Sequence, residues 1–103
     1  MAWVYIGIAG TLEIVWAFAM KQSDGFTRPL PTIIMLVTMI GSFGFLALAM
    51  RSLPLGTAYM AWTGIGALGA FLVGVTILGE ELSPMRIIAA TLILAGILTM
   101  RAA

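Results

Sequence analysis

Four long apolar runs, separated by short polar segments, limit how this chain can fold. They extend over residues 2–20, 30–50, 56–78 and 84–100. Each has about the 17–25 residues that a helix needs to cross a bilayer. Backbone groups in lipid must form hydrogen bonds within their own segment, so runs this long and apolar are expected to be helices. The sequence predicts an all-α integral membrane protein in which residues 1–103 form a single domain of four transmembrane helices.

The composition agrees with a membrane protein and excludes several kinds of chemistry. Hydrophobic residues make up 62% of the chain and charged residues only 9%, far from the usage of soluble domains. Without Cys or His, the chain has no disulfide, no thiol or histidine catalysis and no Cys/His metal site. Its net charge of +1, without a basic stripe, argues against a nucleic-acid partner. We expect no metal and no cofactor.

The first run also has some features of a secretory signal. The sequence Ala17-Phe18-Ala19 is similar to a small-residue cleavage site. However, no basic residue precedes the run, the run is long enough to span a bilayer, and Glu13 interrupts it. These features depart from the signal-peptide pattern, so we interpret residues 2–20 as a retained transmembrane helix.

The basic residues give almost no instruction about orientation. Four spans place Arg51 and Arg101 on one side of the membrane, and Lys21, Arg28 and Arg86 on the other. The positive-inside rule requires a clear excess on one side, so both orientations are expected. An antiparallel homodimer would then place two copies of the first helix across a pseudo-two-fold axis in the membrane plane. We expect one copy to form a compact bundle with a filled interior, so a solute path requires an oligomer.

Glu13 is a single carboxylate inside an otherwise uncharged run. At about 1.5 Å per residue, it lies roughly 16 Å along a helix that starts near Ala2, within a hydrocarbon layer about 30 Å thick. Its side chain is too short to reach either surface. Ionisable groups at that depth usually serve an ion or substrate path, so Glu13 is the first candidate site residue. The alternative is a protonated Glu that only packs against a neighbouring helix.

Helical spacing places polar and aromatic residues together on three faces. The faces are Gly10, Glu13, Trp16 and Ala17 in the first run; Thr38, Ser42 and Phe45 in the second; and Tyr59, Trp62 and Gly66 in the third. A carboxylate among aromatic rings suits an organic cation, and a planar guanidinium can bond both carboxylate oxygens. Taken singly, the aromatic residues are also typical lipid-interface anchors, and Ser42 can bond its own helix backbone.

The third run is rich in small residues. Gly66, Ala70 and Gly74 recur every four residues, which lets helix backbones approach closely in membranes. Gly64 and Gly66 lie near mid-membrane, where paired glycines favour a bend or a hinge. Gly is common in transmembrane helices, so the same row is also consistent with packing inside one subunit.

Three sequence segments resemble the small multidrug resistance family, in its guanidinium exporter subtype. They are Glu13 with Trp16, the loop at residues 21–28 (KQSDGFTR) and the stretch at residues 56–67 (GTAYMAWTGIGA). The resemblance covers the whole chain. Trp16 and Thr63 favour the guanidinium subtype over the multidrug branch. The chain departs from the family's pattern at Gln22, Asp24 and the pair Glu80-Glu81, and none of these residues belongs to the expected site.

The resemblance implies a dual-topology antiparallel homodimer in the bacterial inner membrane that exports guanidinium in exchange for protons. It implies that Glu13 binds both proton and substrate, and that the paired glycines, Gly64 and Gly66, serve as a hinge. The residues implied to line the site and orient Glu13 are Gly10, Trp16, Ser42, Tyr59 and Trp62. The expected partners are guanidinium, protons, a second copy of the chain and membrane lipid.

Other functions stay open at this point. A multidrug exporter of quaternary ammonium or other lipophilic cations is the main alternative, since Met39, Phe43 and Phe45 provide an apolar portal along the second run. An ion channel or proton leak built on Glu13 is another alternative, and a non-transporting accessory subunit is a third. An enzyme is least favoured, because no second catalytic group can be placed beside Glu13 within one chain.

Overall fold

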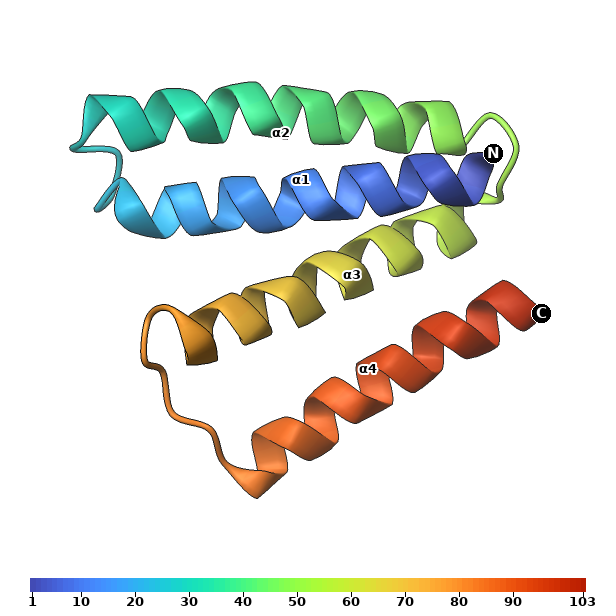
Figure 1. Ribbon diagram of the computed structural model, residues 1–103. Coiled ribbons are helices and arrows are strands. Elements are labelled where there is room, and N and C mark those ends of the chain that lie inside the picture. Colours follow the sequence, from blue (N-terminus) through green and yellow to red (C-terminus); the bar gives the residue numbers. More distant parts are fainter.

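The computed structural model describes all residues, 1–103, and contains four helices and no strands (Figure 1). They are α1 (Ala2–Gln22), α2 (Pro29–Ala49), α3 (Leu55–Thr76) and α4 (Pro84–Ala102). All four are long and apolar enough to cross a membrane, which confirms the all-α membrane fold. Pro29 and Pro84 begin α2 and α4, where a missing N–H is tolerated. The helix α3 ends at Thr76, two residues before the end of the third apolar run, and Gly79 follows with φ +69°.

The helices form one thin layer in the order α2, α1, α3, α4 (Figure 1), and α3 also contacts α2. The molecule measures 41 × 34 × 16 Å, and its thinnest dimension is little more than one helix diameter of about 10–12 Å. The expectation of a compact bundle is therefore wrong. The contacts of α4 explain the difference, because this helix packs along α3, reaches α1 only through Arg101 near its end, and does not fold back to close the bundle.

The three connections alternate between the two ends of the layer. The N-terminus, the loop between α2 and α3, and the C-terminus lie at one end, while the other two loops lie at the opposite end (Figure 1). This arrangement separates Arg51 and Arg101 from Lys21, Arg28 and Arg86, as the count of apolar runs predicts.

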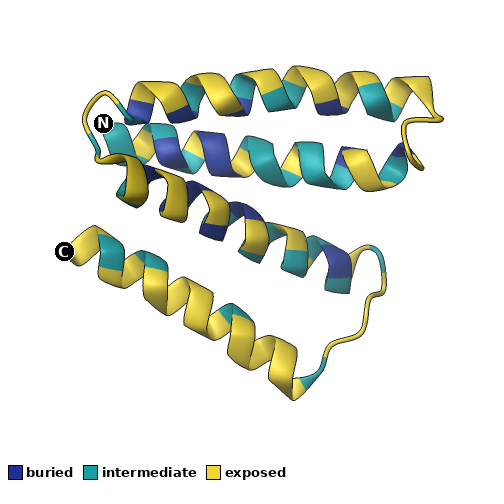
Figure 2. Ribbon diagram, turned by 180° about the vertical axis from the view of Figure 1, so that it is seen from behind, coloured by how far each residue is buried: buried dark blue, intermediate teal, exposed yellow.

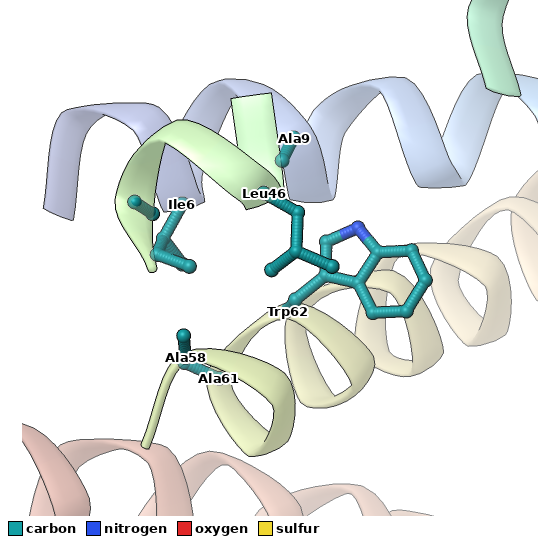
Figure 3. Packing of buried hydrophobic residues seen from close by; sticks show 7 residues of the cluster. Ile6, Ala9, Leu46, Ala58, Ala61 and Trp62 are labelled. Carbon is teal, nitrogen blue, oxygen red and sulfur yellow. The ribbon is translucent and has the colours of Figure 1, made fainter. Parts of the chain in front are cut away.

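The buried core lies where α1, α2 and α3 meet. It consists of Ile6, Ala9, Leu46, Ala49, Ala58, Ala61 and Trp62. Four of these seven residues are alanines, which let the helix backbones approach closely, and close packing is the main source of helix association in lipid. The large Trp62 indole extends from α3 towards α1, and its nitrogen lies on the side of α1 (Figure 3).

The last helix has almost no core of its own. No residue of α4 is buried, and nearly its whole surface is exposed (Figure 2). Ile97 packs over Gly64 of α3, where an added Cβ would lie 2.6 Å from the Ile97 Cδ1 atom. At its end, the Arg101 guanidinium lies 5.6 Å from the centre of the Trp3 ring on α1. One chain therefore leaves a full helix face without a protein partner.

Candidate functional site

The Glu13 side chain lies between α1 and α3, against Gly66. A Cβ built at Gly66 would overlap the Glu13 carboxylate, with its Oε1 atom nearest. Gly66 is itself buried. The Glu13 carboxylate therefore occupies the space that a side chain at position 66 would fill. This contact is possible only because residue 66 has no side chain.

Two polar atoms at this place have no partner within the chain. Both Glu13 Oε1 and Trp16 Nε1 are buried and form no hydrogen bond. A buried polar atom without a partner is costly in an apolar environment. The carboxylate and the indole N–H lie one helical turn apart on α1, so together they offer an acceptor and a donor to a ligand or to a second subunit.

A hydrogen-bond chain joins α1, α2 and α3 one turn away from Glu13. The Trp62 indole N–H on α3 donates to the Ser42 hydroxyl on α2 at 2.9 Å. The Ser42 hydroxyl in turn donates to the backbone carbonyl of Ala9 on α1 at 2.7 Å. In an α-helix the carbonyl of Ala9 faces the N–H of Glu13, so this chain fixes the backbone turn that carries the carboxylate.

An aromatic row runs from Trp16 to Tyr59 across the same three helices. Trp16 packs edge-on against Phe43 of α2, with ring centres 6.5 Å apart. Phe43 meets Trp62 at 5.8 Å, and Trp62 meets Tyr59 at 5.4 Å. Phe43 and Tyr59 are about half exposed, at 48% and 52%. Their faces can receive an organic cation or the surface of another protein chain.

The structure places the other expected site residues as follows. Ser42 is bonded to Trp62 and Ala9 and reaches Glu13 only through the backbone of α1. The space beside Gly10 is taken by Ile65, since a Cβ there would lie 2.5 Å from the Ile65 Cγ2 atom. The helix α3 continues unbroken through Gly64 and Gly66, and both glycines admit a neighbouring side chain. Their hinge role stays a prediction.

The match to known proteins agrees with this arrangement. The family model for Small Multidrug Resistance protein matches residues 1–93. The chain belongs to the small multidrug resistance family. The family, together with four membrane-spanning helices and bacterial relatives, makes it a multi-pass protein of the bacterial inner membrane.

Several relatives that match almost end to end are named guanidinium exporter. The protein from Yersinia pestis is 52% identical over 103 residues, which cover 100% of this chain and 99% of the relative. The proteins from Citrobacter freundii and Escherichia coli strain K12 are 50% and 48% identical over 101 residues, covering 98% of this chain and 96% of each relative.

Two contacts in this small multidrug resistance protein were not foreseen from sequence. Phe43, assigned to an apolar portal, links Trp16 to Trp62 in the aromatic row. Ile65 fills the space over Gly10. Helical spacing groups residues within one helix only, and neither contact follows from it. The sequence feature related to both contacts is the high density of small residues. Small residues indicate that two helices pack closely, but they do not identify the side chain that makes the contact.

The link between Ser42 and its two partners leads to a stability prediction. Ser42→Ala removes both hydrogen bonds and leaves the buried Trp62 N–H without a partner, so we expect a loss of about 1–2 kcal/mol. The matched control is Thr38→Val, because the Thr38 hydroxyl bonds only carbonyls of its own helix, those of Ile34 and Met35. Thermal unfolding in detergent compares the two variants. Equal stability would show that the interhelical bonds contribute nothing.

Proposed function

We propose that this protein is a proton-coupled antiporter that exports guanidinium through a membrane-embedded Glu13 site shared by two subunits. The observation that carries the proposal is the Glu13 carboxylate in the middle of a membrane-spanning helix, which has an unpartnered oxygen and lies one helical turn before Trp16, the first residue of the aromatic row. Relatives about 50% identical over nearly the whole chain are named guanidinium exporter, which supports the choice of substrate. Such a protein is a transporter and not an enzyme.

The coupling of proton movement to guanidinium export follows because both the proton and the cation bind the same carboxylate. A proton and a guanidinium cation each neutralise Glu13, so they compete for it. A proton that arrives from outside displaces the cation outwards, and loss of that proton towards the cytoplasm prepares the carboxylate for the next cation. Alternating access requires that Glu13 be open to only one side at a time. Trp16, Tyr59 and Trp62 would line the site, and Ser42 would hold the α1 backbone beside it.

The open layer supports the second subunit in the proposal. A layer 16 Å thick cannot enclose a path for a solute, and α4 has a full exposed face. The two-against-three division of basic residues favours both orientations, so the two copies are proposed to pair antiparallel. That pairing would bring the two Glu13 residues together near the middle of the membrane.

The half-exposed aromatic rings favour a second candidate, a multidrug exporter of quaternary ammonium or other lipophilic cations. Phe43 and Tyr59 expose about half of their surface, and exposed aromatic faces also bind ammonium cations that cannot form a bidentate pair with a carboxylate. The two candidates therefore differ in whether the substrate must donate hydrogen bonds to Glu13.

Proteoliposomes that contain the purified protein and a pH-sensitive dye inside test this choice. Guanidinium added outside is expected to drive saturable proton movement, while tetramethylammonium and a larger quaternary ammonium cation drive much less. If the ammonium cations drive proton movement equally well, the multidrug function replaces guanidinium export. Conductive, unsaturable movement would indicate a channel.

A further inference from the structure

A hollow of about 190 Å³ lies between α1 and α3, towards the end of the layer that carries the loops after α1 and α3. Ala17 and Lys21 of α1 line it from one side, and Ala70 of α3 lines it from the other. Glu80, which follows α3, also lines it. The hollow therefore has apolar walls, to which Ile14, Phe18, Val73 and Leu78 also contribute, and one charged group of each sign.

The hollow continues the same seam that holds Glu13. Glu13, Ala17 and Lys21 follow one another every four residues on α1, and Gly66, Ala70 and Gly74 do so on α3. Gly66 lies against the Glu13 carboxylate, and Gly74 lies against the Glu80 carboxylate. Eight residues of helix correspond to about 12 Å. Two carboxylates thus mark the two ends of one seam, in which Ile14 packs over Gly69 and the alanines Ala17 and Ala70 line the hollow.

The fold directs Glu80 back onto α3. Gly79 has φ +69°, which reverses the chain after the helix end, and the Glu80 N–H donates to the Gly74 carbonyl at 2.9 Å. A carboxylate near a helix C-terminus is disfavoured by the helix dipole. Lys21, in the last turn of α1, lines the same hollow and supplies a positive charge there. Glu80 and the adjacent Glu81 are both exposed, but only Glu80 lines the hollow.

We infer that this hollow is a vestibule of the transport path, in which Glu80 attracts a small planar cation of the guanidinium type on its way to or from Glu13. Lys21 is a tethered cation that competes with the substrate for Glu80. The inference rests on the proposed function and adds a second carboxylate to it. In the antiparallel dimer, one such vestibule would open at each face of the membrane.

Transport kinetics in proteoliposomes give the first test. Glu80→Gln is expected to raise the KM for guanidinium about threefold to fivefold, the size typical of a partly exposed charge contact, with the maximal rate unchanged. Lys21→Gln is expected to lower the KM, because it removes the competing cation. The matched control is Glu81→Gln, which makes the same change in net charge and leaves the KM unchanged. A purely structural role predicts a loss of maximal rate in both Glu80→Gln and Lys21→Gln, and that result would overturn the inference.

Thiol labelling gives a second test that does not depend on transport. The chain has no cysteine, so Ala17→Cys introduces one thiol into the hollow. A cationic methanethiosulfonate reagent is expected to modify it, guanidinium is expected to slow the reaction, and an added Glu80→Gln is expected to slow the cationic reagent but not a neutral one. Ala47→Cys, on the exposed side of α2, is the control that guanidinium does not protect.

The outcomes separate the two proposals. If wild-type protein shows no guanidinium-driven proton movement but Glu80 still accelerates the cationic reagent, the proposed function fails and the cation-attracting hollow stands. If wild-type protein transports guanidinium and Glu80→Gln changes neither the KM nor the labelling rate, the vestibule is wrong and the proposed function stands.

Discussion

Glu13→Gln is expected to abolish guanidinium-driven proton movement in proteoliposomes. Gln has nearly the same size, but it can neither release a proton nor balance the charge of a bound cation. Removing one partner of a buried ion pair costs about 3 kcal/mol or more, which is on the order of 100-fold in affinity. Coupling is lost altogether, since no other carboxylate and no basic side chain lies within residues 2–20 of α1. Proton flux and binding of guanidinium, measured by calorimetry in detergent, check both effects.

Two further variants show whether the loss is specific to this carboxylate. Glu81→Gln removes an exposed carboxylate outside the helices and should leave transport unchanged. Glu13→Asp keeps the charge but withdraws it from Gly66, so we expect coupled transport at a reduced rate. Transport by Glu13→Gln at the wild-type rate would exclude Glu13 as the coupling residue and would favour an accessory or unrelated role for it.

Gly66→Ala is expected to be nearly as damaging, although it adds only one methyl group. The added Cβ would occupy the position of the Glu13 carboxylate, so either the carboxylate or α3 must move. Forcing extra volume into a packed place typically costs about 1–3 kcal/mol. We therefore expect a protein that still folds but has lost most of its guanidinium transport, as measured by proton flux together with thermal unfolding.

Gly44→Ala is the matched control, because a Cβ at this exposed position of α2 meets nothing within 4 Å. Combining Gly66→Ala with Glu13→Asp separates two roles for the glycine. If Gly66 serves to make room for the carboxylate, the shorter acid should restore part of the activity. If Gly66 acts as a hinge, the shorter acid restores nothing, and the space argument is wrong.

Much of the fold could be predicted because membrane helices are specified locally. Each apolar run is long enough to span the bilayer, and lipid leaves the backbone no alternative to a helix. The same locality explains why Glu13 could be recognised as a candidate site residue. A carboxylate in the middle of an apolar run is unusual by itself, before any neighbour is known.

The pairing of helices was less accessible to sequence reasoning. Helices that are apolar on every side carry little information about which faces meet, because lipid is as apolar as the protein core. For this reason a compact bundle was expected, whereas the helices form an open layer in which α4 packs along α3. For the same reason, the contacts of Glu13 with Gly66 and of Glu80 with Gly74 could not be predicted from the sequence.

The sequence by itself determined the four helices, their alternating directions, the membrane location and the carboxylate at mid-membrane, because each depends on the length and composition of one segment. Only the tertiary structure decided that Ser42 bonds Trp62 and Ala9, and that a glycine makes room for the carboxylate. Those features depend on contacts between residues on different helices, where an absent side chain matters as much as a present one.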